Sequence, residues 1–120
     1  LNTAVGNFAM NSVVWNGSQY VATGQGGKCA TSPDGITWTN QAGLPSATGG
    51  NRMYSVIWDG SQYVAVGGGC RCATSPDGIT WTNQVSLVTA TGGGNNLYQV
   101  VYNGSQYVTV GANNTCATSP

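Results

Sequence analysis

An internal repeat constrains this chain more than any other feature. Residues 29–39 read Cys-Ala-Thr-Ser-Pro-Asp-Gly-Ile-Thr-Trp-Thr, and residues 72–82 have the same sequence. A third copy begins at Cys116 and runs to Pro120. The spacing is 43 residues from Ser32 to Ser75 and 44 from Ser75 to Ser119. A fixed period of this length indicates a repeat architecture, so we divide the chain into repeats 1–43, 44–86 and 87–120.

Each repeat predicts short strands separated by turns. In the first repeat, strands rich in β-branched and aromatic residues are expected at residues 12–15, 19–23, 28–32 and 36–39. Asn16-Gly17 predicts a type I′ hairpin turn, with positive φ at both residues. Pro33-Asp34-Gly35 predicts the turn before the fourth strand. No helical periodicity occurs, so no helix is expected.

The later repeats follow the same pattern. Strands are expected at residues 53–58, 62–66, 71–75 and 79–82, and then at 97–102, 106–110 and 115–119, with linkers at 40–52 and 83–96. Four antiparallel strands in roughly 40–50 residues are typical of a β-propeller blade, with a β-solenoid as the alternative. The predicted fold is all-β, with about 2.7 propeller-like repeats, incomplete as a single ring because closure needs at least four blades. We therefore expect the chain to continue in a longer protein or to associate with further copies of itself.

The composition bears on possible partners. Charged residues make up 5% of the chain, the net charge is zero, and histidine is absent. Without a basic patch, the phosphate-neutralising part of nucleic-acid binding is missing, so no nucleic acid is expected. No apolar run reaches the ~18–20 residues that span a bilayer, so no membrane partner is expected. An uncharged polar surface repels its own copies only weakly, which permits close association.

The repeated segment resembles the Asp-box of sialidase-type (bacterial neuraminidase repeat) propellers. That box reads Ser/Thr-x-Asp-x-Gly-x-Thr-Trp and lies between the third and fourth strands of a blade, whereas this chain has one residue fewer between Asp and Gly. The resemblance implies a structural role, in which the Asp accepts backbone N–H groups and the Trp packs between blades. The matching residues are Ser32, Asp34, Gly35 and Trp38, and Ser75, Asp77, Gly78 and Trp81.

Catalysis is not expected. Sialidases of this fold use three arginines, a Tyr–Glu pair and an Asp acid, but this chain has only Arg52 and Arg71 and no Glu. The absence of histidine excludes Ser-His and Cys-His nucleophiles. The carboxylates of Asp34, Asp59 and Asp77 lie in turns of the repeats, Asp59 as a turn residue alone. We predict no catalytic residue, cofactor or metal ligand.

The four cysteines suggest cross-links. Cys29, Cys72 and Cys116 occupy equivalent positions, and Cys70 stands two residues before Cys72. Four cysteines without histidine favour disulfides, and hence an extracellular or cell-surface location. Residues two apart in a strand point the same way, so we hypothesise the pairs Cys29–Cys70 and Cys72–Cys116. A four-thiolate zinc site and links between chains remain alternatives.

These observations favour a non-enzymatic, extracellular structural repeat protein that self-associates, as in a fibre or surface layer. The first alternative is a lectin-like propeller module that binds glycans through aromatic and amide side chains. Tyr54 and Tyr98, beside the glycine-rich linkers, are the expected exposed aromatics for such contacts. The second alternative is a non-catalytic fragment of a sialidase-like propeller. The predicted partners are further copies or further repeats, with glycans under the first alternative.

Overall fold

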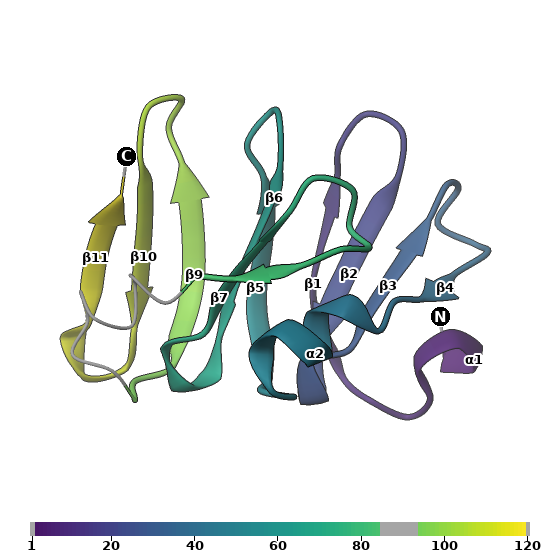
Figure 1. Ribbon diagram of the computed structural model, residues 1–120, viewed down its shortest axis with the longest axis horizontal. Coiled ribbons are helices and arrows are strands. Elements are labelled where there is room, and N and C mark those ends of the chain that lie inside the picture. Colours follow the sequence, from purple (N-terminus) through teal and green to yellow (C-terminus); the bar gives the residue numbers. More distant parts are fainter. Residues whose placement is uncertain (1, 85–93, 120) are drawn as a thin grey trace.

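The protein is a row of three antiparallel sheets, seen in a computed structural model that describes residues 2–84 and 94–119 (Figure 1). Within each sheet, strands follow one another in chain order. The first sheet comprises β1 (Met10–Trp15), β2 (Tyr20–Gly24), β3 (Cys29–Ser32) and β4 (Thr39–Asn40). The second comprises β5 (Met53–Trp58), β6 (Tyr63–Gly67), β7 (Cys72–Ser75) and β8 (Thr82–Asn83), and the third β9 (Leu97–Tyr102), β10 (Tyr107–Gly111) and β11 (Cys116–Ser119). The all-β class and the propeller-like repeats are confirmed.

The first strands of the repeats hold the row together. β1, β5 and β9 lie side by side, and the three sheets do not close into a ring (Figure 1). The backbone N–H of Val56 donates to Ser12 Oγ at 3.1 Å, and the N–H of Val100 donates to the equivalent Ser55 Oγ at 3.4 Å. A strand hydroxyl thus links each sheet to the next.

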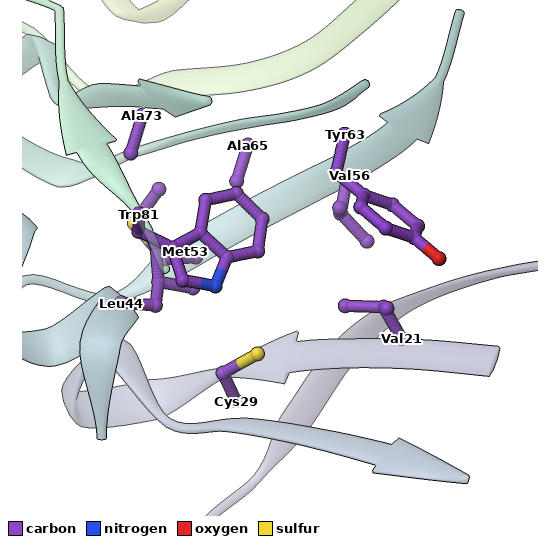
Figure 2. Packing of buried hydrophobic residues seen from close by; sticks show 9 residues of the cluster. All are labelled: Val21, Cys29, Leu44, Met53, Val56, Tyr63, Ala65, Ala73 and Trp81. Atoms are coloured by element: carbon purple, nitrogen blue, oxygen red, sulfur yellow. The ribbon is translucent and has the colours of Figure 1, made fainter. Parts of the chain in front are cut away.

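Two apolar clusters fill the spaces between neighbouring sheets. The first and larger cluster lies between the first and second sheets, and its buried members are Val21, Cys29, Leu44, Met53, Val56, Tyr63, Ala65, Ala73 and Trp81 (Figure 2). The cluster between the second and third sheets contains Val64, Val66, Cys72, Leu97 and Val100. Burial of these side chains between sheets is the main stabilising contribution expected for such a repeat array.

The fourth strands differ from the prediction. They were expected at residues 36–39 and 79–82, but β4 and β8 have two residues each and begin three positions later. The reason is local, because the Asp34 carboxylate accepts the backbone N–H groups of Ile36 and Thr37 at 2.8 Å each. Those groups are therefore not available to a strand ladder.

The hairpin and linker predictions were also partly wrong. The loop after β1 has four residues, Trp15 pairs with Tyr20, and only Gly17 within it has positive φ. Asn16 Oδ1 instead accepts the N–H groups of Ser18 and Gln19 at 2.8 Å each. Short helices that periodicity did not predict are α1 (Asn2–Val5) and α2 (Gly43–Thr48), with 3-10 turns η1 (Gln25–Gly27), η2 (Gly68–Cys70) and η3 (Ala112–Asn114). Most of the second linker lies outside the described residues.

No helix within residues 2–84 and 94–119 has the length and apolar character needed to cross a membrane.

Candidate functional site

The Ser-Pro-Asp-Gly turn is a self-contained hydrogen-bonded unit. Ser75 Oγ accepts the N–H groups of Asp77 at 3.3 Å and Gly78 at 2.8 Å. Asp77 Oδ1 accepts the N–H groups of Ile79 at 2.8 Å and Thr80 at 2.9 Å. Trp81 Nε1 donates to the Gly78 carbonyl at 3.1 Å, which orients the indole ring. The carboxylate thus satisfies backbone donors that the tight turn cannot pair internally.

The same unit forms in the first repeat without a neighbouring sheet. Ser32 Oγ accepts the Gly35 N–H at 2.8 Å, and Trp38 Nε1 donates to the Gly35 carbonyl at 3.0 Å. Backbone hydrogen bonds from Thr37 and then Ile36 hold the pKa of Asp34 below its usual value, and those from Thr80 and Ile79 do the same for Asp77. The conformation of the segment is therefore set by its own residues.

In the second repeat this segment is packed against the first sheet. A Cβ built on Gly78 would lie 2.9 Å from Val21 Cγ2 and 3.4 Å from Thr31 Cγ2, so only glycine allows this approach. Gln19 Nε2 donates to the Asp77 carbonyl at 2.8 Å and to the Tyr63 hydroxyl at 3.1 Å. We call the surface formed by Gln19, Val21, Cys29 and Thr31 the first seat, and residues 77–81 are its occupant.

Trp81 is the centre of this contact. Its side chain is 7% exposed and lies over Cys29, with Met53 and Leu44 beside it (Figure 2). The Cys29 thiol donates to the Gly78 carbonyl at a sulfur–oxygen distance of 3.8 Å. By contrast, Trp38 at the open end of the row is only half-buried, and its ring packs 6.4 Å from that of Tyr20.

A cavity of about 240 Å³ lies between the second and third sheets. Its second-sheet wall includes Gln62, Val64, Cys72 and Thr74, which are one repeat after the four residues of the first seat. Its third-sheet wall includes Val100, Tyr107, Thr109 and Ala117. We call this cavity the hollow. No tryptophan of the described residues lines it, whereas Trp81 fills the equivalent space one repeat earlier.

The edge of β11 lies beside the hollow. In the first two sheets the short fourth strand pairs with the third, through Ala30↔Asn40 and Thr31↔Thr39, and through Ala73↔Asn83 and Thr74↔Thr82. The equivalent residues of the third sheet are Ala117 and Thr118. β11 is the outer strand of that sheet, and no strand within residues 2–84 and 94–119 pairs with its outer side.

The structure contains no disulfide bond among Cys29, Cys70, Cys72 and Cys116, so the two hypothesised pairs are not formed. Equivalent cysteines point the same way along the row: Cys29 lies against the Gly78 carbonyl, Cys72 lines the hollow, and Cys116 is exposed. Cys70 is not on a strand but in η2, with φ of 60° where the first repeat has Gly27. The expectation that Cys70 and Cys72 share a strand was therefore wrong.

Two of the thiols are buried in apolar surroundings. Burial raises the pKa of Cys29 to about 12 and that of Cys72 to about 11. Both side chains are therefore neutral thiols at physiological pH and pack as small apolar groups. Within the described residues, no group of three or more His, Cys, Asp or Glu side chains is close enough to hold a metal ion.

Asp59 does more than the turn role that its sequence position predicted. Its Oδ1 accepts the N–H groups of Ser61 and Gln62 at 2.8 Å each, as expected for the hairpin turn. Its Oδ2 also accepts the hydroxyl of Tyr107 from the third sheet. Partial burial raises the pKa of Asp59, but the bonds from Tyr107 and the turn outweigh it, and the net pKa is lowered. Asp59 thus links two repeats.

Tyr54 and Tyr98 pack against each other. Their ring centroids are 5.0 Å apart with an interplanar angle of 75°, an edge-to-face contact between β5 and β9. Tyr98 is 47% exposed, but Tyr54 is half-buried, so the expectation that both are exposed holds for Tyr98 alone. The pair contributes to the contact between the second and third sheets.

Comparison with solved structures supports the architecture. The chain is similar to YCF48 from Cyanidioschyzon merolae, with a TM-score of 0.51 and 19% sequence identity. The match covers 90% of this chain and 49% of that one, so this chain spans about half the length of YCF48. At this identity the likeness shows the fold alone, which is that of β-propeller-like repeats. No protein-family profile and no curated protein matches the sequence.

Sequence reasoning placed the turn residues but missed the hollow. The segment after the third Ser-Pro pair is what fills the equivalent space in the repeat before it, so aligning the three repeats position by position would have located the vacant seat. The pairing of Asp59 with Tyr107 had a weaker signal, the replacement of Asn16 and Asn103 by an aspartate at one hairpin of three.

Proposed function

We propose that this chain is a non-enzymatic structural repeat protein that self-associates end to end, sheet against sheet, at an extracellular or cell-surface location. The carrying observation is that equivalent apolar residues are buried inside the row and exposed at its two ends. The repeated turns are proposed to be structural Asp-boxes of the sialidase type, because their carboxylates are already used by backbone N–H groups.

The open face of the first sheet illustrates the point. Val13 is 59% exposed, whereas its equivalents Val56 and Val100 are 3% and 2% exposed because a preceding sheet covers each of them. Trp15 beside it on β1 is 46% exposed. A preceding sheet from a second copy would cover both side chains, with roughly 25 cal/mol gained per Å² of apolar surface removed from water.

The open face of the third sheet is the counterpart. Val110 is 46% exposed, whereas its equivalents Thr23 and Val66 are fully buried by the sheet that follows. Val101 is 50% exposed on the same sheet. The two open faces therefore have the residue types of two surfaces that already pack together within the chain. A contact of unlike faces is heterologous, so it can propagate into rings or filaments.

The mass of the native particle, measured by light scattering over a range of concentrations, tests this proposal. We expect the mean mass to rise with concentration, and Val13→Asp to abolish the rise because it places a charge in the contact. Ser46→Asp adds the same charge on the exposed side of α2 and is the matched control. A chain that stays monomeric at millimolar concentration would contradict the proposal.

Glycan binding remains a second candidate because of the tyrosine pair. The exposed edge of Tyr98, supported from below by Tyr54, is an aromatic surface of the kind that sugars stack on. A glycan array probed with the wild type and with Tyr98→Ala would test it. Binding lost with Tyr98→Ala but kept with Val13→Asp would favour the glycan-binding module.

A further inference from the structure

We propose that the hollow and the outer edge of β11 together form a receptor for one strand-forming segment, supplied by residues 34–40 of a second copy. This inference deepens the proposed function and rests on it, since it names the site through which two copies are joined. Its occupant is the first-repeat counterpart of the 77–81 segment and of β8.

The walls of the hollow already match this occupant. Val64, Cys72 and Thr74 reproduce Val21, Cys29 and Thr31, which hold the 77–81 segment in the first seat. Gln62 reproduces Gln19, whose side-chain amide donates to the carbonyl of the bound aspartate at 2.8 Å. A segment with the sequence Asp-Gly-Ile-Thr-Trp would therefore meet the same partners in the hollow, with its indole ring over Cys72 as that of Trp81 lies over Cys29.

The strand edge beside the hollow adds a second, independent requirement. In both complete sheets the residues that follow the tryptophan pair with the third strand, and a glutamine then donates to a strand threonine: Gln41 to Thr31 Oγ1 at 3.0 Å and Gln84 to Thr74 Oγ1 at 2.9 Å. Ala117 and Thr118 offer the equivalent positions on β11. An added strand would thus be held by main-chain hydrogen bonds while the tryptophan fills the hollow, which is recognition by β-strand addition.

The donor segment is present and accessible in every copy. Residues 29–41 and 72–84 are identical in sequence, and the turn bonds of the first repeat have nearly the same lengths as those of the second. Asp34, Gly35 and Thr37 are exposed, Ile36 is 81% exposed, and Trp38 is half-buried. β4 is joined to β3 by only two residue pairs, so its release disrupts few bonds.

Donation would bring the first sheet of the donor beside the third sheet of the acceptor. The crossing residues are those around Pro33, and neighbouring packed sheets lie about 10 Å apart, a distance that three extended residues span. Val13 of the donor and Val110 of the acceptor would then face the same new contact. Exchange of an identical element between copies in this way is domain swapping, here open-ended because donor and acceptor surfaces differ.

A synthetic peptide of residues 31–41, labelled at its N-terminus, tests the receptor directly by fluorescence anisotropy with the intact chain. We expect saturable binding, weakened at least about 30-fold in the Trp38→Ala peptide, since the buried indole is the anchor. The Thr37→Ala peptide is the matched control, because both Thr37 and its seated counterpart Thr80 are exposed. Equal binding of the Trp38→Ala and wild-type peptides would overturn the proposal.

Two variants of the full chain test the second copy as the occupant. Ala117→Trp fills the hollow from β11 and should abolish peptide binding and assembly, while Trp38→Ala removes the donor anchor and should abolish assembly alone. Mixing them pairs one intact donor with one intact acceptor, so a one-to-one complex is expected by sedimentation. If Ala117→Trp fails to fold, shown by circular dichroism, Trp38→Ala mixed with wild type should still cap and shorten the assemblies.

The outcomes separate this inference from the proposed function. Assembly that both variants leave unchanged would overturn the receptor while the end-to-end proposal stands. Peptide binding by a wild-type chain that never assembles would overturn the second copy as occupant, together with the self-association proposal.

Discussion

The comparison of Trp81 with Trp38 isolates what a neighbouring sheet contributes. The two residues share an identical local sequence and the same bond to a glycine carbonyl, at 3.1 and 3.0 Å. They differ in packing, since Trp81 is 7% exposed between two sheets and Trp38 is half-buried at the open end. Replacing each with alanine therefore removes the same local interactions, and the difference reports the packing between sheets.

The expected magnitudes follow from burial. Trp81→Ala should cost about 3–5 kcal/mol in the free energy of unfolding, the range for a large aromatic removed from a packed core. Trp38→Ala should cost about 1 kcal/mol, as for a partly exposed side chain. At roughly 4 °C per kcal/mol for a chain of this size, the two melting temperatures should differ by about 8–16 °C.

Thermal unfolding followed by circular dichroism, with urea unfolding as a second probe, measures both variants. The measurement is made at low protein concentration, where end-to-end association does not cover Trp38. If the two substitutions lowered stability equally, the indole would act only within its own turn, and the seat would have no energetic role.

Three further results are expected. Gly78→Ala should destabilise the fold by about 1–3 kcal/mol more than Gly35→Ala, because both have φ near +78° but only the Cβ at position 78 would lie 2.9 Å from a neighbouring side chain; equal melting temperatures would contradict this. Since the folded-state pKa values of Asp34 and Asp77 lie below the unfolded value near 3.9, their stabilising contribution should be complete above about pH 5 and decline as pH falls through the folded-state pKa, seen in melts from pH 7 to 2; the absence of histidine predicts a flat profile from pH 5 to 8, and a transition there would refute it. At pH 8 the exposed Cys116 should be alkylated by iodoacetamide well before Cys29, whose pKa is raised to about 12, as followed by peptide mass spectrometry; equal rates would show that Cys29 is not buried.

The repeat spacing and the turn chemistry were enough to predict the sheets, because each strand is bounded by residues that cannot continue it. β5 and β9 occur at the predicted bounds, Met53–Trp58 and Leu97–Tyr102. The short fourth strands were mispredicted because β-branched residues after Asp34 favour a strand, while the carboxylate takes their N–H groups. α2 lacks an apolar period, since Leu44 and Thr48 are its buried residues, so the helix depends on tertiary contact.

The candidate site was predicted only in part. Local sequence is sufficient to place Ser75, Asp77 and Trp81 in one turn, because their bonds span three residues or fewer. What that turn packs against depends on Val21 and Cys29, a whole repeat away, and no local pattern encodes such a contact. The direction in which the cysteines point likewise follows from how the sheets stack, which is why the disulfide hypothesis was not met.

The identity of residues 29–41 and 72–84 has a consequence for folding kinetics. During refolding, either segment can occupy either seat with the same contacts, so side chains do not discriminate the correct docking from the shifted one. The correct choice is favoured by tethering, since a segment joined to its seat by a short stretch of chain has an effective concentration in the millimolar range. As protein concentration approaches that value, docking between chains competes with docking within one, and misassembly becomes a matter of dilution. The length of chain between the repeats is thus what distinguishes one from the next.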